Sequence, residues 1–242
     1  MAYWEELSMF LKIKNISKKF GGLTALENVS LAIDKGELVG LIGPNGSGKT
    51  TLLNCISGIY RVDEGSIHYK DELISNLKPH QIVQKGISRN FQVSRIFKKL
   101  SVLQNMLLTV YHMKRGSDPK TKALNLLEFV GILHLKDDLA GTLSGGQKKL
   151  LEFARMLMAD PELFLLDEPF AGVHPLLKKE LTDHVKDLNK EEKTFIIVSH
   201  DIPTTLGLCE KAIALDEGKI ISVGSPEEIR NDPKVIEAYL GA

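Results

Sequence analysis

A glycine-rich segment between a predicted strand and a predicted helix constrains the fold of this chain more than any other feature. Its residues are Gly43-Pro44-Asn45-Gly46-Ser47-Gly48-Lys49-Thr50, which fit the pattern G-x-x-x-x-G-K-[ST]. The apolar run Leu38–Ile42 precedes it and predicts a buried strand, and residues 49–56 predict a helix. In this setting the backbone N–H groups of the loop and the positive end of the helix can surround phosphate oxygens. The pattern therefore predicts nucleotide binding by an α/β fold.

Several side chains of this loop have predicted roles in holding a nucleotide and Mg²⁺. Lys49 would reach the β- and γ-phosphates, and the Thr50 hydroxyl would ligate Mg²⁺. The predicted phosphate-binding set of the loop is Gly43, Pro44, Asn45, Gly46, Ser47, Gly48, Lys49, Thr50 and Thr51. The alternative is a glycine-rich turn that fits the pattern by chance, at a frequency on the order of one per cent for a chain of this length.

Two adjacent carboxylates follow a second apolar run. Residues 163–166 are all apolar and lead directly into Asp167 and Glu168, although a buried strand does not normally finish in two acids. In a phosphate site Asp167 would hold Mg²⁺ directly or through water, and Glu168 would polarise the water that attacks the γ-phosphate. The alternative is a solvated strand end before a turn at Pro169, and the phosphate loop in the same chain makes that less probable.

Apolar runs rich in β-branched residues alternate with longer helical patterns along the chain, which favours an α/β fold. Strands are predicted at 10–16, 29–33, 38–42, 163–166, 195–199, 212–215 and 220–223. Helices are predicted at 49–56, 102–113, 120–130, 147–158, 175–189 and 226–230. From about residue 60 to residue 141 few runs look like buried strands, so the sequence predicts a helical lobe inserted into a parallel-sheet core.

Composition excludes several classes of protein. Lys plus Arg is 31 and Asp plus Glu is 31, which excludes the strong basic bias of a dedicated nucleic-acid binder, and no nucleic-acid partner is expected. Two cysteines are too few for a disulfide framework or a four-cysteine zinc site. The residues before Leu11 do not resemble a secretory signal, and the longest charge-free stretch, 100–113, is too short to span a bilayer.

A third motif, Leu143-Ser144-Gly145-Gly146-Gln147, precedes a helical pattern that ends near Asp160-Pro161. Ser144 predicts a helix N-cap, and the N–H groups exposed there can also bind an anion. With the two motifs above, this signature resembles the ATP-binding-cassette family over almost the whole chain. The resemblance implies that Ser144, Gly145, Gly146 and Gln147 bind the γ-phosphate of ATP held by a second ATPase subunit, identical or homologous.

The resemblance implies roles for three further residues. Phe20 corresponds to the aromatic residue that stacks on adenine, with a core phenylalanine as the alternative. Gln92 corresponds to the glutamine that meets Mg²⁺ and the attacking water, with a plain loop residue as the alternative. His200 corresponds to the histidine that contacts the γ-phosphate, although a lone His at a strand end is usually a surface residue. The expected catalytic set is Lys49, Gln92, Glu168 and His200, and the expected Mg²⁺ set is Thr50, Gln92 and Asp167.

The resemblance also implies the organisation of the chain. It predicts one domain over residues 1–242, with a phosphate-loop NTPase core of mostly parallel sheet and an N-terminal antiparallel part. The nucleotide-binding core would comprise 1–85 and 160–242, and the helical lobe with the signature about 90–158. The sequence departs from the family at His174, which stands where an aspartate usually organises contact across the dimer.

Three segments, residues 87–92, 97–105 and 237–241, resemble the branched-chain amino-acid importers of this family. The implied function is ATP hydrolysis, with ATP and Mg²⁺ as cofactors, at the cytoplasmic face of the cell membrane. The peripheral subunit would power uptake of a small solute, branched-chain or related amino acids, through separate integral membrane permease subunits. A soluble ATPase of iron–sulfur cluster assembly is the main alternative. A GTPase is disfavoured because residues 189–192 lack the final aspartate of N-K-x-D, and a non-catalytic subunit because Lys49, Asp167, Glu168 and His200 are present.

A cationic loop after Gln92 contains two large apolar residues, Ile96 and Phe97, between Arg95 and the pair Lys98-Lys99. Exposing both apolar side chains to water would forgo roughly 1.5–3 kcal/mol each. The sequence therefore predicts that they line a groove for a short helix of the permease. In the alternative, Phe97 folds back on an apolar stripe formed by Leu103 and Leu107.

Overall fold

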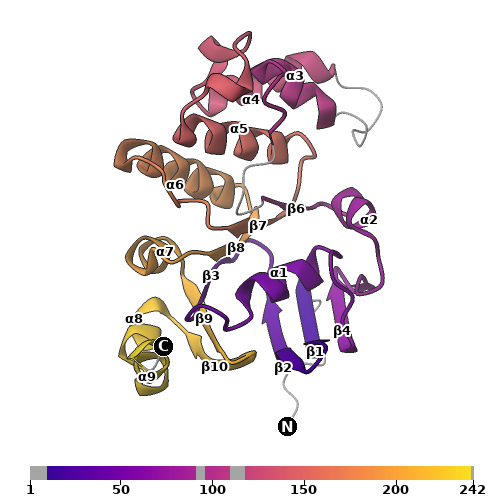
Figure 1. Cartoon of the computed structure of the whole chain (residues 1–242), viewed down its shortest axis with the longest axis vertical. Coiled ribbons are helices and arrows are strands. Elements are labelled where there is room, and N and C mark those ends of the chain that lie inside the picture. Colours follow the sequence, from indigo (N-terminus) through magenta and orange to yellow (C-terminus); the bar gives the residue numbers. More distant parts are fainter. Residues whose placement is uncertain (1–9, 91–95, 110–117, 241–242) are drawn as a thin grey trace.

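The computed structural model describes residues 10–90, 96–109 and 118–240, which form two sheets and the helices packed on them (Figure 1). The strands are β1 (Leu11–Phe20), β2 (Leu23–Ile33), β3 (Leu38–Ile42), β4 (Glu64–Tyr69), β5 (Glu72–Leu73), β6 (Ile87–Arg89), β7 (Leu163–Asp167), β8 (Thr194–Val198), β9 (Lys211–Asp216) and β10 (Lys219–Gly224). The helices are α1 (Lys49–Ile56), α2 (Pro79–Gln84), α3 (Val102–Leu107), α4 (Pro119–Phe129), α5 (Gly145–Leu157), α6 (Pro175–Lys190), α7 (Ile202–Leu208), α8 (Pro226–Asn231) and α9 (Pro233–Leu240). None of the described helices combines the length and apolar composition needed to cross a bilayer.

The larger sheet has the strand order β10-β9-β3-β8-β7-β6, with only β10 antiparallel to its neighbour. Its central strands are buried throughout, since helices cover both faces. Alternate residues point to opposite sides, so that in β7 Phe164 belongs to one core and Leu165 to the other. This explains why these strands read as continuous apolar runs in the sequence.

Helix α1 lies between the two sheets. The antiparallel sheet, in the order β2-β1-β4-β5, contributes Ile13 and Ile67 to the core that contains Leu52 and Leu53 of α1 and Leu165 of β7. The opposite face of the larger sheet shares a core with α3, α4, α5 and α6, which lie in the upper part of Figure 1. The phosphate loop thus begins a helix that is fixed on two sides.

All seven predicted strands and all six predicted helices are present, with bounds shifted by a few residues. Helix α3 ends at Leu107, earlier than the predicted residue 113, and residues 110–113 lie outside the described part of the chain. The antiparallel N-terminal part is confirmed. Between residues 60 and 141, where the sequence predicts few buried strands, the structure has the three strands β4, β5 and β6. These strands are short or partly exposed, so they lack the apolar runs that mark buried strands.

Candidate nucleotide-binding site

The site is built where the carboxyl ends of parallel strands meet. Strands β3, β8 and β7 are neighbours in parallel register, so the residues that follow them emerge at the same edge of the sheet. The phosphate loop follows β3, Glu168 follows β7, and Ser199 and His200 follow β8. Three segments that are far apart in the sequence therefore converge because of the strand order.

Lys49 closes the phosphate loop on itself. Its ammonium donates hydrogen bonds to the carbonyl oxygens of Gly43 and Pro44, both at 2.7 Å, and lies 3.3 Å from Ser47 Oγ. Burial lowers the pKa of Lys49, and the negative charges of Glu168 and Asp167 oppose that shift. The two carboxylates are therefore close enough to Lys49 to act on its charge. The loop's Asn45 and Gly46 are exposed, as is Thr50, so its outer rim is open to a ligand.

Asp167 is held in a buried network that the sequence did not predict. Its carboxylate pairs with Arg89 at 2.9 Å, and both side chains are almost fully buried. Arg89 also donates to Asn54 Oδ1 of α1 at 2.7 Å and to Ser57 Oγ at 3.1 Å. Asn90 fixes the backbone of Asp167 on both sides: its Nδ2 donates to the carbonyl oxygen, and its Oδ1 accepts from the N–H. The end of β6 thus connects the carboxylate to the helix after the phosphate loop.

Glu168 has an unusual backbone conformation for a residue with a side chain. Its φ of 51° lies in the left-handed region, and its N–H donates to the carbonyl oxygen of Val198 at 2.8 Å. Its carboxylate is buried, with Oε2 3.4 Å from Ser199 Oγ and Oε1 3.5 Å from His200 Nε2. Among the described residues, no donor makes a hydrogen bond to Oε1. One carboxylate oxygen therefore remains able to accept a proton or a water hydrogen.

Phe20 is not a core residue. It ends β1 with 41% of its surface exposed, and its ring meets that of Tyr60 edge to face at 5.0 Å. The Lys18 ammonium lies 5.4 Å from the ring centroid. The core alternative for Phe20 is wrong, and its partly exposed ring can receive a planar ligand.

The signature segment forms the start of α5. Ser144 Oγ accepts from the Gln147 N–H at 3.2 Å, and Gln147 Oε1 accepts from the Ser144 N–H at 2.9 Å, which confirms the predicted N-cap as a capping box. Gly146 packs closely on α6, because a Cβ there would lie 2.4 Å from Leu177 Cδ1 and the leucine side chain would have to shift. Ser144 and Gly145 are exposed, so this helix end faces solvent in the single chain.

His174, the departure from the family pattern, is the N-cap of α6, with Nδ1 accepting from the Leu176 N–H at 3.4 Å. It fills a helix-capping role that aspartate also performs. Gln92 lies outside the described residues, so the structure does not place it. Arg89, Asn90 and Ser199 belong to the site but are not predicted from the sequence. The only signal for the first two is a polar pair at the end of a short strand.

The donor set fits a hard divalent cation. Asp167 offers carboxylate oxygens and Thr50 a hydroxyl, and such oxygen donors are those that Mg²⁺ prefers. Mg²⁺ usually binds one or two protein groups and completes its coordination with phosphate oxygens and water. Accordingly, the described residues include no group of three or more His, Cys, Asp or Glu side chains that could hold a metal alone.

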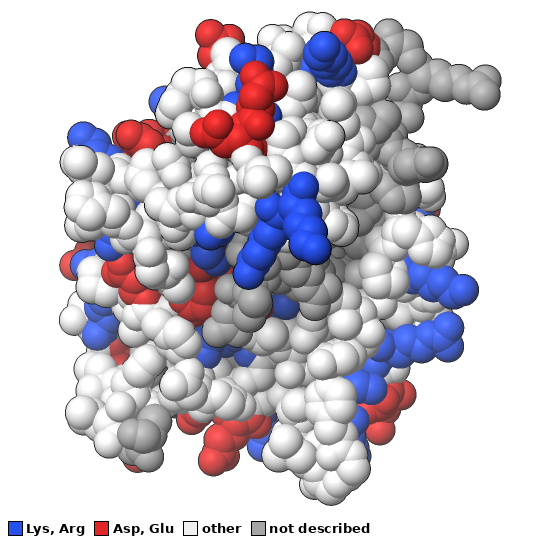
Figure 2. All heavy atoms as spheres, turned by 45° about the horizontal axis from the view of Figure 1, so that its top comes forward, with Lys and Arg blue, Asp and Glu red and all other residues white. Residues whose placement is uncertain are grey.

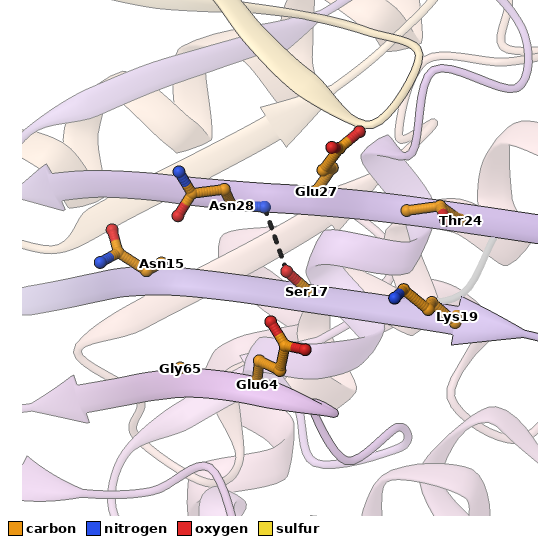
Figure 3. Close-up of a pocket in the computed structure, with 8 residues that line it drawn as sticks. All are labelled: Asn15, Ser17, Lys19, Thr24, Glu27, Asn28, Glu64 and Gly65. Carbon is orange, nitrogen blue, oxygen red and sulfur yellow. Dashed lines mark hydrogen bonds between the residues drawn. The ribbon is translucent and has the colours of Figure 1, made fainter.

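A hollow on the antiparallel sheet lies apart from the residues of the nucleotide-binding site (Figure 3). Its volume is about 610 Å³, and its lining residues are Asn15, Ser17, Lys19, Thr24, Glu27, Asn28, Glu64 and Gly65. It coincides with register shifts in β1, where Asn15 and, on β2, Asn28 have positive φ. The bulges explain the hollow.

On the face drawn in Figure 2, basic and acidic side chains are interspersed.

The comparisons with known proteins identify the class. Residues 26–171 match the family described as ABC transporter, and residues 219–242 match one described as branched-chain amino acid ATP-binding cassette transporter. The chain belongs to the ATP-binding-cassette transporter family. It is an ATP-binding ATPase of that family, as the motifs predicted.

Individual relatives are described as proteins of the same class. The chain is 41% identical to a probable branched-chain amino acid transport ATP-binding protein LivG of Archaeoglobus fulgidus, over 96% of this chain and 95% of the relative. A nucleotide-free ATP-binding cassette superposes with a TM-score of 0.87 and 37% identity, covering 97% of this chain and 100% of that one. A dimeric cassette with ADP and phosphate superposes with a TM-score of 0.81 and 28% identity, covering 89% and 98%.

The buried Arg89–Asp167 pair generates a stability prediction. Arg89→Met should lower the free energy of unfolding by about 3–5 kcal/mol, because Asp167 is left as an unpaired buried charge. Adding Asp167→Asn to that variant should restore part of the loss. Urea unfolding of both variants and the wild type measures this. Lys190→Met, which removes an exposed ion pair with Asp187, is the control and should have little effect. Equal losses for Arg89→Met and Lys190→Met would contradict the prediction.

Proposed function

We propose that this chain is the ATPase subunit of an importer for branched-chain or related amino acids. In this proposal it acts at the cytoplasmic face of the cell membrane and drives separate integral membrane permease subunits. The main support for ATP hydrolysis is that four side chains converge at one sheet edge, namely Lys49, Asp167, Glu168 and His200. The solute class is supported by the match of residues 219–242 and by the LivG relative. The same match favours transport over iron–sulfur cluster assembly.

The geometry indicates a separate role for each residue of the site. Lys49 would leave the carbonyl oxygens of Gly43 and Pro44 and pair with the β- and γ-phosphates. Thr50, Asp167 and Gln92 would hold Mg²⁺, which when bound neutralises phosphate charge. Glu168 Oε1, which accepts no hydrogen bond from the described residues, would orient the attacking water and accept its proton. His200, 3.5 Å away and half exposed, would contact the γ-phosphate.

The nucleotide site would be completed by a second ATPase subunit. The exposed N-terminus of α5, at Ser144 and Gly145, presents the positive end of the helix dipole, which suits an anion. Strands β6, β7 and β8 lie between α5 and α1 in Figure 1, so the signature is separated from the chain's own phosphate loop. A facing chain would bring its signature to this loop. The dimeric cassette relative supports that arrangement.

The proposed permease contact lies near Phe97. Its side chain is 53% exposed, and the Arg155 guanidinium lies 5.8 Å from its ring centroid. Arg155 in turn lines a hollow of about 330 Å³ between β6 and α5. Ile96, in contrast, is partly buried and packs against the core of the helical part, so it offers less free surface to the predicted groove than Phe97 does. Phe97, which contacts Arg155 and is largely exposed, is the residue available to a partner helix.

Glu168→Gln tests the hydrolytic role. The amide cannot accept the proton of the attacking water, so kcat should fall at least about a hundredfold while ATP affinity stays near wild type. Lys49→Ala should instead weaken ATP binding itself, because a charge-assisted contact is lost. Equilibrium binding and steady-state hydrolysis separate the two effects. Wild-type turnover in the Gln variant would refute the assignment of Glu168.

A mixing experiment tests the shared site. Ser144→Arg damages the signature and Lys49→Ala the phosphate loop, so each homodimer should be inactive. A mixed dimer restores one intact composite site, and weak ATPase activity should appear on mixing if one site can act alone. Activity of either variant by itself would show that each chain forms a complete site.

Phe97→Ala tests the permease contact. Hydrolysis by the isolated subunit should stay near wild type, while assembly with the permease and amino-acid uptake in proteoliposomes should fall several-fold. Leu139→Ala, which truncates another exposed apolar side chain, is the matched control. Unchanged assembly with a lowered melting temperature would show that Phe97 serves folding instead.

A further inference from the structure

The C-terminal part of the chain contacts the phosphate loop at both ends. The Gly43 N–H donates a 2.6 Å hydrogen bond to the hydroxyl oxygen of Tyr239, which lies 196 residues further along. At the other end of the loop, the Gly218 N–H donates to the carbonyl oxygen of Ser47 at 3.0 Å. Two backbone groups of a loop that binds phosphate are thus fixed by residues 218–239.

Only glycine fits at position 43. Its φ of 150° is rarely adopted by residues with a side chain, and a Cβ there would lie 2.0 Å from the carbonyl oxygen of Leu215. The carbonyl oxygen of Gly43 accepts from Lys49 Nζ at 2.7 Å. Tyr239 therefore holds the N–H of the same residue whose carbonyl oxygen holds the Lys49 ammonium.

Tyr239 is itself fixed by packing. Helix α9 carries it, and the tyrosine packs against a small core that includes Ile42 of β3, Ile229 of α8 and Val235 of α9. Burial raises the pKa of Tyr239, so its hydroxyl remains protonated near neutral pH. A neutral hydroxyl on a docked helix is a rigid acceptor for the loop.

We propose that Tyr239 is a positioning residue for the phosphate loop. By this contact, residues 219–242, which match the branched-chain amino acid cassette family, would set the affinity of the loop for nucleotide. Tyr239 does not touch the nucleotide in this proposal. It fixes the Gly43 peptide and hence the resting place of Lys49. The inference rests on the proposed ATP site and adds a role for the C-terminal helix.

The test is Tyr239→Phe, which removes the hydroxyl and keeps the ring that packs in the core. Removing one neutral hydrogen bond should raise the Kd for ATP and for ADP by about three- to tenfold. The KM for ATP should rise by a similar factor, with kcat within about twofold of wild type. Hydrogen exchange at the start of the loop should become faster in the nucleotide-free protein.

Tyr69→Phe is the matched control. Tyr69 is buried, and its hydroxyl has no hydrogen-bond partner among the described residues, so its loss should leave the Kd unchanged. Binding is measured well below both melting temperatures, so that each variant is fully folded. A Kd for Tyr239→Phe within twofold of wild type overturns the proposal, whatever the melting temperature. So does an equal rise in Tyr69→Phe. Failure of the wild-type protein to bind ATP would overturn the proposed function as well.

Discussion

The parallel pairing of β3, β8 and β7 is the constraint on which the rest of the site depends. Parallel strands place their carboxyl ends together, so a loop after β3 and acids after β7 meet although more than a hundred residues separate them. Continuous apolar runs can form these strands only because helices cover both faces. The buried sheet and the exposed chemistry at its edge are therefore consequences of one arrangement.

This arrangement buries charged side chains, which the fold has to stabilise. Asp167 and Lys49 are both buried, and isolated buried charges are strongly unfavourable. The chain satisfies them separately: Arg89 pairs with Asp167, and the carbonyl oxygens of Gly43 and Pro44 receive the ammonium. These two buried charges thus have partners within the fold. A bound nucleotide with Mg²⁺ would compete with these partners, which makes the site ready for ligand without leaving charges unpaired.

Local patterns predicted the loop, the carboxylates and the central strands because each depends on residues adjacent in sequence. Strand β3 and helix α1 have the predicted bounds, since an apolar run and a glycine-rich turn define both. Strands β4 and β6 were missed because pairing with distant strands, not their own composition, makes them strands. For the same reason no local pattern predicts the Arg89–Asp167 pair or the contact of Tyr239 with Gly43, which join residues 78 and 196 positions apart.

The signature segment combines close packing with an exposed helix end. In α5 the capping box satisfies the Ser144 and Gln147 N–H groups, whereas Ser144 and Gly145 remain exposed. Gly146 is committed to packing against Leu177 at the start of α6, directly after the His174 cap. The helix end is therefore capped and packed on one side, yet it faces solvent on the other. In the proposed dimer, this exposed helix end would meet an anion held by the facing subunit.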